Sequence, residues 1–258
     1  MDMLSQTPEE KIFAAHLADV IENASKRRTP VFSQFMDTRK QTIAMLLLKG
    51  SRTESYSFFG GYSEAEHKVL ALHSGNLDEQ AVLRQAPISV VKVTYKKNES
   101  LTHRDFLGAL MSLRLSRESF GDIIVSDDRG TAHIFVLKNM AEIVASELKS
   151  VGRTGVLAEL ADLCDFRYEP RFEEIKGTVP SFRLDCVVAL MISKSRALAQ
   201  ELIENESVSV AHRIMTQPSK QVAEGSVVSV KRYGRFILES YGAVTKKGRN
   251  FVICKKYL

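Results

Sequence analysis

The sequence predicts an α+β protein made of three successive domains, at residues 1–80, 81–165 and 181–258. Three observations lead to this fold class. Apolar residues recur at helical spacing near the N-terminus, strand and helix signals alternate in the middle of the chain, and basic residues are concentrated at the C-terminal end. Of the 258 residues, 44% are hydrophobic and 26% are charged, which is the balance of an ordinary folded protein.

The first domain is predicted to be a small α+β structure that begins with a helix over residues 7–23. Thr7 can cap this helix, and the proline and two glutamates that follow suit its first turn. A second helix is predicted at Thr38–Lys49, where apolar residues again form a stripe. Gly60-Gly61-Tyr62 is typical of a turn and precedes a strand-like run, Lys68–His73.

The middle domain is predicted from a regular alternation of strands and helices. The order β-α-β-β-α-β is that of a ferredoxin-like or RRM-like split βαβ sandwich, which many unrelated proteins share. In chain order we expect a strand at Ile88–Tyr95, a helix at Thr102–Leu113, a hairpin of Asp122–Val125 and Thr131–Leu137 with Asp127 and Asp128 in its turn, a helix at Asn139–Val151 capped by Asn139, and a strand within Gly155–Leu163.

The sheet of this middle domain offers few aromatic residues for RNA. An RRM-type sheet needs solvent-facing aromatic side chains on its central strands, and the predicted strands provide only Phe135 and Tyr95. We therefore favour a structural or protein-docking role for the domain. Residues 164–180, which carry Pro170 and Pro180, are expected to form a linker or a strapping segment.

The charge of the chain is unevenly distributed. Residues 181–258 hold 13 Lys and Arg against 6 Asp and Glu, whereas residues 1–180 hold 23 against 25. Such an asymmetry is the electrostatic footprint of a module that binds a polyanion. Binding to an anionic membrane would require a basic amphipathic helix with exposed aromatics. Because the basic residues fall largely in strand-like segments, nucleic acid is favoured.

Basic side chains are predicted to gather at a helix N-terminus in this last domain, where unpaired N–H groups favour anions and a guanidinium can bind phosphate bidentately. Arg183, Lys194 and Arg196 supply the charge, and Gln200 shares the exposed side of the helix with Arg196. In chain order we expect a helix at Phe182–Leu190, a helix from Lys194 to about Asn205 capped by Ser193, strands at Val208–Val210 and Ser226–Arg232, and a basic hairpin tip at Thr245-Lys246-Lys247-Gly248-Arg249.

This domain contains several short sequence motifs: Arg183-Leu184-Asp185, Ser193-Lys194-Ser195-Arg196, Ala199, Leu202-Ile203, Val208-Ser209-Val210 and Glu224-Gly225. Together they resemble the S-four RNA-binding domain, a small αL module. Further words lie along the rest of the chain: Gly60-Gly61-Tyr62, Glu64-Ala65-Glu66, His103-Arg104-Asp105-Phe106-Leu107-Gly108-Ala109-Leu110, Gly121-Asp122-Ile123 and Gly234-Arg235-Phe236. With them, the whole chain resembles the bacterial YlmH family, which joins the S-four module to two N-terminal domains.

The chain departs from the family pattern at four positions. Glu206 and His212 stand where the family favours glycine, Ala211 where it favours asparagine, and Ser226 where an aspartate is common. The loss of turn glycines puts the local hairpin geometry in question, and Glu206 adds a negative charge beside the proposed RNA face.

The resemblance implies binding of structured RNA. YlmH-like proteins are associated with the large ribosomal subunit and with ribosome-associated quality control, where they are thought to hold peptidyl-tRNA on obstructed subunits and to support C-terminal tail synthesis. The implied partners of this chain are therefore rRNA of the large subunit and tRNA. The candidate RNA-binding residues are Arg183, Lys194, Ser195, Arg196, Gln200, Lys231, Arg232, Arg235, Lys246, Lys247 and Arg249.

Catalysis finds little support in the sequence. His103, Arg104 and Asp105 are consecutive and would point in different directions on a helix, so a cap and a surface ion pair explain them better than a catalytic role. The three cysteines are far apart, and Cys186 lies among apolar residues, as a buried and inert thiol would in a cytoplasmic protein.

We therefore expect a cytoplasmic, monomeric protein that is not an enzyme. No cofactor, metal or small-molecule substrate is expected, and no apolar run approaches the roughly 20 residues that span a membrane. Two alternatives stay open: an RNA-modifying enzyme that its S-four domain targets to RNA, and a factor associated with cell division.

Overall fold

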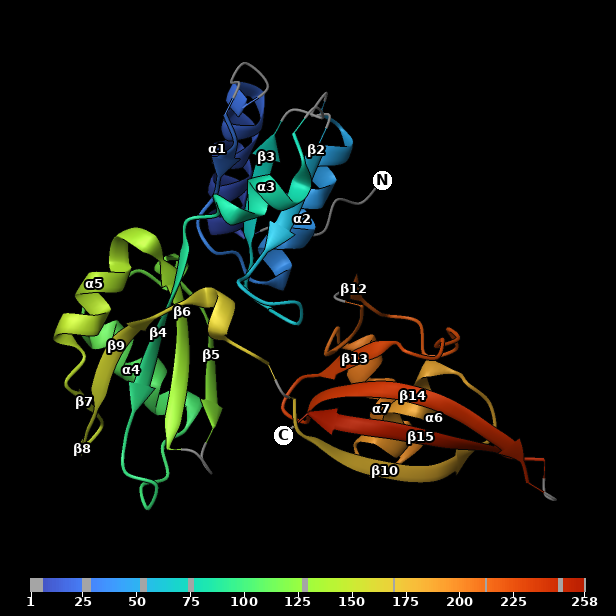
Figure 1. Cartoon of the computed structure of the whole chain (residues 1–258). Coiled ribbons are helices and arrows are strands. Elements are labelled where there is room, and N and C mark those ends of the chain that lie inside the picture. The colour runs from blue at the N-terminus through green and yellow to red at the C-terminus, as the bar shows by residue number, and fades with distance from the viewer. Residues whose placement is uncertain are drawn as a thin grey trace. The chain divides into compact units, whose positions relative to one another are not determined.

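The chain folds into two compact units, Met1–Tyr168 and Glu169–Leu258, which we name the N-terminal unit and the C-terminal unit. Both mix helices with sheets, so the predicted α+β class is confirmed. The division into three domains stays a prediction. Figure 1 shows the computed structural model, which describes residues 7–24, 29–51, 55–73, 77–126, 130–168, 170–211, 213–245 and 248–257. In these ranges no helix is long and apolar enough to cross a membrane.

The first half of the N-terminal unit is a three-stranded antiparallel sheet in the order β1-β3-β2, with helices packed against it (Figure 1). The first helix starts where predicted. The Thr7 hydroxyl accepts a hydrogen bond from the Glu10 N–H at 3.2 Å, and the Glu10 carboxylate accepts one from the Thr7 N–H at 3.1 Å. The elements are α1 (Pro8–Ala24), β1 (Val31–Phe32), α2 (Thr38–Lys49), β2 (Ser55–Phe59), β3 (Val69–His73) and α3 (Glu79–Arg84).

The sequence predicted the long elements of this half and missed the short ones. The helix at Thr38–Lys49 and the strand within residues 68–73 are confirmed. Strand β1 has two residues and helix α3 has six, so neither is long enough to produce a periodic pattern of apolar residues. Strand β2 was missed as well, although it pairs with β3 over its full length.

The second half of the N-terminal unit is a four-stranded sheet in the order β5-β6-β4-β9, in which all neighbouring strands are antiparallel. This order and the element sequence confirm the predicted ferredoxin-like topology. Helices α4 and α5 contribute to the core cluster on one face of the sheet. The elements are β4 (Ile88–Thr94), α4 (His103–Ser112), β5 (Phe120–Ser126), β6 (Thr131–Leu137), α5 (Lys138–Glu147), a small β7 (Ser150–Val151) and β8 (Thr154–Gly155) hairpin, and β9 (Leu157–Ala161).

The helix caps of this half were predicted with mixed success. Thr102 caps α4 as expected, and the Asp105 carboxylate accepts hydrogen bonds from the Thr102 N–H and hydroxyl at 2.8 and 2.6 Å. The prediction that Asn139 caps α5 is wrong, because the helix already starts at Lys138 and Leu137 occupies the cap position. The expected turn residues Asp127 and Asp128 lie outside the described residues.

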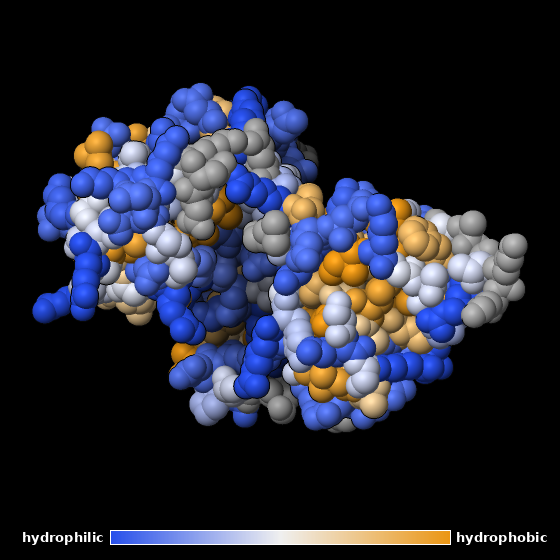
Figure 2. All heavy atoms as spheres, turned by 90° about the horizontal axis from the view of Figure 1, so that it is seen from below, coloured by the Kyte–Doolittle hydropathy of each residue, from blue (hydrophilic) through white to orange (hydrophobic). Residues whose placement is uncertain are grey.

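The C-terminal unit is a six-stranded antiparallel sheet, ordered β10-β15-β14-β13-β11-β12, with helices α6 and α7 packed against it. Figure 2 shows apolar residues gathered on one face of this unit and hydrophilic residues around them. The elements are β10 (Phe172–Val179), α6 (Leu184–Met191), α7 (Arg196–Glu204), β11 (Val208–Val210), β12 (Arg213–Ile214), β13 (Val227–Val230), β14 (Gly234–Val244) and β15 (Asn250–Tyr257).

Strand β10 corrects the interpretation of residues 164–180 as a linker. Its eight residues pair with β15 from Phe172 to Val179, so this segment is an edge strand of the C-terminal sheet. Gly177 allows the strand to approach α6 closely, because a Cβ atom there would lie 2.3 Å from the Leu190 side chain. The two prolines that suggested a linker stand just outside the paired residues, where proline costs no ladder hydrogen bond.

The cap of α7 and the turns after it also differ from expectation. Ser195, not Ser193, caps α7, and its hydroxyl accepts a hydrogen bond from the Leu198 N–H at 3.2 Å. Ser193 instead adopts the left-handed φ of 52°. Glu206 and Ala211 keep the left-handed backbone that glycine or asparagine would favour, with φ of 55° and 46°. Both turns therefore keep the left-handed conformation despite the substitutions, at a cost in backbone strain. His212 lies outside the described residues.

Candidate nucleic-acid interface

Three of the predicted RNA-binding side chains meet on one buried carboxylate, Asp185, in the first turn of α6. Arg183, which caps α6, reaches Asp185 through Nε and Nη2 at 3.2 and 3.0 Å. Arg196, the first residue of α7, donates to Asp185 Oδ2 from Nε and Nη2 at 3.0 and 2.8 Å. Gln200 adds a hydrogen bond from Nε2 at 3.1 Å. We name these four residues the Asp185 cluster.

The electrostatics of the cluster hold the carboxylate ionised and the guanidinium groups in place. Asp185 is fully buried, and burial by itself would raise the pKa of its carboxyl. The hydrogen bonds from Arg183, Arg196 and Gln200 outweigh burial and hold that pKa well below its usual range. The same contact raises the pKa of the Arg183 guanidinium. Both partners therefore stay charged at neutral pH.

The outer sides of the two guanidinium groups face solvent. The Arg183 side chain is 35% exposed and the Arg196 side chain 48%, while the carboxylate between them is inaccessible. Each uses Nε and Nη2 on Asp185, which leaves Nη1 outside the ion pair. Lys194 and Ser195 are exposed immediately before α7, at the end of the helix where backbone N–H groups point outward. This arrangement can hold phosphate oxygens bidentately.

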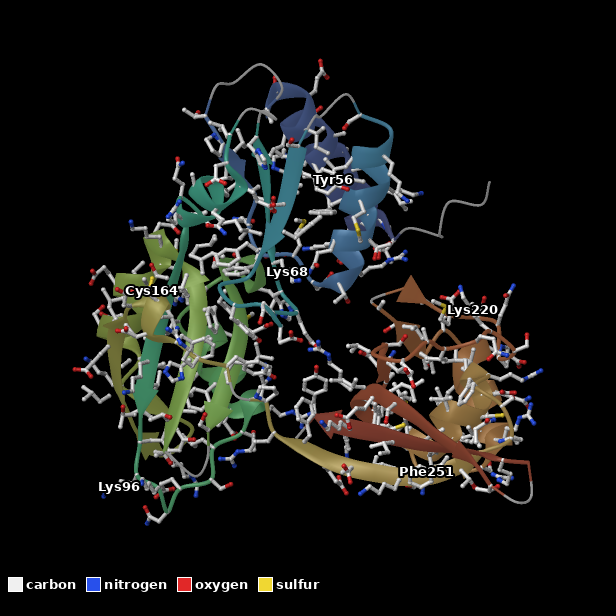
Figure 3. All side chains as sticks on the ribbon, turned by 45° about the vertical axis from the view of Figure 1, so that its right-hand side comes forward. Tyr56, Lys68, Lys96, Cys164, Lys220 and Phe251 are labelled. Carbon is white, nitrogen blue, oxygen red and sulfur yellow. The ribbon has the colours of Figure 1, made fainter. Side chains whose placement is uncertain are left out.

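Lys220 is a basic residue of this surface that the sequence did not single out. Its backbone carbonyl accepts a hydrogen bond from the Leu184 N–H at 2.8 Å, and the next residue, Gln221, pairs with Arg183. The chain thus returns to the start of α6 after 36 residues, which no local pattern signals. The Lys220 side chain is exposed on the C-terminal unit (Figure 3).

Lys231 and Arg232 lie elsewhere on the C-terminal unit, in the tight turn between β13 and β14. Both side chains are exposed, and the Lys231 N–H donates to the Ser207 carbonyl at 2.9 Å, beyond the C-terminal end of α7. The nine residues of α7 therefore separate this turn from Arg196, by roughly 13 Å along the helix axis. Lys231 and Arg232 therefore form a basic surface separate from that of the Asp185 cluster.

Two of the predicted residues have structural partners within the sheet. The Arg235 guanidinium lies 4.5 Å from the centre of the Tyr257 ring, which identifies a cation–π contact. Arg249, at the base of the β14–β15 hairpin, donates to the hydroxyl and the carbonyl of Thr178 at 3.0 and 2.6 Å. The hairpin prediction is confirmed by the closing bond from the Thr245 N–H to the Arg249 carbonyl at 2.7 Å. Lys246 and Lys247 lie outside the described residues.

In the N-terminal unit, the sequence words that carried the family resemblance converge on a second buried carboxylate, Asp122. It accepts hydrogen bonds from the Tyr62 hydroxyl at 2.8 Å and from the Glu66 and His67 N–H groups at 2.7 and 3.1 Å. His67 Nδ1 lies 2.6 Å from Asp122, and its Nε2 lies 2.6 Å from Arg117 Nη2. We name these five residues the Asp122 network.

The Asp122 network resembles a catalytic Asp–His pair, but its geometry serves packing. A guanidinium can only donate, so we assign the His67 ring proton to Nδ1, and Nε2 accepts from Arg117 instead of facing a nucleophile. Burial would raise the pKa of Asp122, yet the hydrogen bonds from His67, Glu66 and Tyr62 hold it below its usual value. Burial, with Asp122 nearby, raises the pKa of Tyr62. The network joins the residues around the Gly60–Gly61 turn to strand β5.

The aromatic residues that an RRM-type sheet would expose are buried. Phe135 is fully inaccessible and lies 5.0 Å from the rings of both Tyr62 and Phe166. Gly61 also lies against it, since a Cβ atom there would come within 2.4 Å of the Phe135 ring. Tyr95 is 6% exposed and packs against Phe106 on the helix side of the sheet. Neither residue is available to stack on a base.

Metal and thiol chemistry find no support in the described ranges. They contain no group of three or more His, Cys, Asp or Glu residues that could hold a metal ion. Cys186 is buried as predicted, and burial raises the pKa of its thiol. Burial likewise raises the pKa of Cys254 to about 12, whereas Cys164 is exposed on the N-terminal unit (Figure 3).

Comparisons with known proteins agree with the geometry of both units. Residues 85–165 match the family described as the putative RNA-binding domain in YlmH, and residues 182–228 match the S4 (S-four) domain. The ribosome-associated protein quality control protein P2 of Bacillus subtilis (strain 168) is 34% identical over 219 residues, which cover 84% of this chain and 83% of that protein.

A solved structure, the cell division protein ylmH from Streptococcus pneumoniae, superposes with a TM-score of 0.51 at 21% identity, over 64% of this chain and 98% of that one. This likeness supports the fold. The two matched domains, together with 34% identity to a relative over most of both chains, establish the family. The chain belongs to the YlmH family of S4-domain RNA-binding proteins.

Proposed function

We propose that this chain is a non-catalytic cytoplasmic factor that binds rRNA and tRNA on the large ribosomal subunit and acts in ribosome-associated quality control of stalled peptidyl-tRNA. The observation that carries the proposal is the Asp185 cluster, which holds two partly exposed arginine side chains, one at the start of α6 and one at the start of α7, with Lys194 and Lys220 nearby. Guanidinium groups fixed by a buried carboxylate bind phosphates without first losing side-chain freedom. The name of the Bacillus subtilis relative supports the ribosomal setting.

The charge distribution supports RNA as the partner of the C-terminal unit. The basic surplus of the chain lies within residues 181–258, and two groups of exposed cations in the described part of that range lie at the N-terminal end of α7 and at the β13–β14 turn. Two separated basic surfaces suit recognition of a folded RNA by its shape and its phosphates. The YlmH match over residues 85–165 supports a further contact from the N-terminal unit, although not through Phe135 or Tyr95.

The experiment is sedimentation of the full chain with purified large ribosomal subunits across a salt series, and in parallel with purified tRNA. The test variant is Lys194→Ala/Lys220→Ala, because both side chains are exposed and neither belongs to the Asp185 cluster. The matched control is Lys11→Ala/Lys49→Ala, which removes two exposed lysines from the N-terminal unit, outside the matched residues 85–165.

Wild-type protein is expected to co-sediment with the large subunit and to be released as salt rises. Each lost phosphate contact lowers the slope of log affinity against log salt by about 0.7–0.9. The slope of the test variant should therefore fall by up to about 1.4–1.8, and that of the control should not change. Absence of co-sedimentation at every salt concentration would refute the ribosomal proposal. An unchanged salt slope in the test variant would exclude this surface as the one that binds the RNA.

A further inference from the structure

The N-terminal unit contains an open groove that the proposed RNA contacts do not use. It has a volume of about 970 Å³ and lies between α1, the segment from Phe32 to Asp37 and the start of α2. Phe13, Leu17 and Val20 line it from α1, and Phe32 and Met36 line it from the segment before α2.

The groove stays open because α1 is attached along a narrow stripe. Leu17 and Ile21 are the buried residues of the helix, while Ile12, at the groove, is 71% exposed. An ion pair braces the walls without filling the space, since Arg39 Nε and Nη2 donate to the Glu10 carboxylate at 2.9 and 3.2 Å. An apolar groove with fixed walls can take an apolar side chain without reorganising.

The charge of the lining is negative. Glu9, Glu10, Asp37 and Glu118 contribute four carboxylates, against two cations from Arg39 and Lys40. Both cations are already paired, Arg39 with Glu10 and Lys40 with Glu118 at 2.9 Å. The surplus therefore rests on Glu9, in the first turn of α1, and on Asp37, whose carboxylate also accepts from the Lys40 N–H at 2.7 Å as the cap of α2. Phosphate groups of RNA or of an anionic membrane would meet like charge here, whereas lysine and arginine would meet opposite charge.

We propose that this groove binds a short segment of a protein partner in which one or two apolar side chains are flanked by lysine or arginine. Ile12 and Phe13 contact the apolar side chains, and Glu9 and Asp37 contact the flanking cations. The inference does not rest on RNA binding by the C-terminal unit, since none of the lining residues belongs to that unit.

The test is selection of a displayed library of random short peptides on the immobilised full chain, with counter-selection on the Ile12→Lys variant. The most enriched peptide is then synthesised with a fluorescein label, and its affinity is measured by fluorescence anisotropy. The test variants are Ile12→Lys and Glu9→Lys, at exposed positions of the groove. The matched control is Leu46→Lys, because Leu46 is 50% exposed on α2 but does not line the groove.

Enriched peptides are expected to combine Lys or Arg with Leu, Ile, Phe or Met. Ile12→Lys should weaken binding of the labelled peptide about tenfold or more, through a lost apolar contact and an added like charge, and Leu46→Lys should leave the affinity within about twofold. Acidic or purely polar peptides, no enrichment over the counter-selection, or equal binding to Ile12→Lys would each overturn the proposal.

Two other occupants are also distinguished. A chain that begins at Thr7 and binds the peptide more than about threefold tighter would identify residues 1–6 as the natural occupant and overturn the proposal. Self-association of the wild-type chain in analytical ultracentrifugation, abolished by Ile12→Lys, would identify a second copy and overturn it in the same way.

Discussion

Asp122 in the N-terminal unit and Asp185 in the C-terminal unit are both buried carboxylates with lowered pKa values, and both accept hydrogen bonds from side chains and backbone N–H groups. Their partners differ. Asp122 binds Tyr62 and His67, which are partly buried, the His67 side chain being 23% exposed, and Arg117 contacts the other ring nitrogen of His67. Asp185 binds Arg183 and Arg196, whose side chains are 35% and 48% exposed.

We interpret this difference as a packing role for the Asp122 network and as support for the proposed binding role of the Asp185 cluster. A buried carboxylate whose partners are also inside fastens distant segments together, because each group would be left without a partner if the others moved. A buried carboxylate whose partners reach the surface orients those partners toward solvent. The same residue type thus supports fold integrity in one unit and presents cations in the other. The following variants test this distinction, from the largest expected effect to the smallest.

Asp122→Ala is expected to lower the free energy of unfolding of the N-terminal unit by about 3–5 kcal/mol, because it leaves the Tyr62 hydroxyl, His67 and Arg117 without their buried charge partner. Urea titrations read by hydrogen exchange of peptides from each unit would measure the loss. The control is Asp19→Ala, at an exposed position of α1, which should cost less than about 0.5 kcal/mol. A cost below about 1 kcal/mol for Asp122→Ala would contradict the packing role.

Asp185→Ala is expected to cost less, about 2–3 kcal/mol, because the half-exposed arginines can be hydrated once the carboxylate is gone. The variant should also bind RNA more weakly, since the two guanidinium groups lose their fixed orientation. The same exchange measurement, together with a salt series on tRNA, tests both effects. If Asp185→Ala costs more stability than Asp122→Ala, exposure of the partners does not distinguish the two sites.

The pH dependence of stability should report the ionised state of Asp185. Its pKa is lower in the folded chain than in the unfolded chain, where it is about 3.9. Its contribution is therefore complete above the unfolded pKa and is lost as the pH falls from about 4 toward the folded pKa. In urea titrations the stability gap between wild type and Asp185→Asn should be constant near neutral pH and should shrink below pH of about 4. A gap that does not change in acid would contradict an ionised carboxylate.

The start of α7, which positions Arg196, can be tested through its cap. Ser195→Ala removes the hydroxyl that accepts from the Leu198 N–H and should cost about 1 kcal/mol. Ser193→Ala is the matched control, because Ser193 stands two residues earlier and does not cap the helix. Chemical denaturation of both variants measures the free energy of unfolding. Equal losses in the two variants would mean that the cap assignment is wrong.

The strained turn after α7 should give the smallest effect, and a stabilising one. Glu206 has a φ of 55°, so Glu206→Gly should relieve strain and stabilise the C-terminal unit by about 0.5–1 kcal/mol. Glu201→Gly, at an exposed position inside α7, is the control and should destabilise by about 1 kcal/mol. Removal of the Glu206 charge should also raise RNA affinity slightly. A destabilising Glu206→Gly would show that its side chain makes a stabilising contact larger than the strain.

Local pattern was enough to determine much of this protein. The helix at Thr38–Lys49, the cap at Thr102 and the β-α-β-β-α-β order follow from periodicity and from residues a few positions apart. The basic surplus of residues 181–258 is a sum over the sequence and needs no fold to be recognised. Several ordered words, weak one by one, were enough to identify the family, because their joint occurrence over nearly the whole length is specific.

Contacts between residues far apart in the chain decided what those patterns could not. Phe172–Val179 is a strand only because β15, some 80 residues later, pairs with it. Asp122 accepts from Tyr62 across 60 residues, and Lys220 meets the start of α6 because Gln221 pairs with Arg183. Phe135 is buried against Tyr62, so it cannot offer the solvent-facing aromatic ring that its place in a strand allowed. Such contacts depend on chain closure and packing, and no residue carries them in its local sequence.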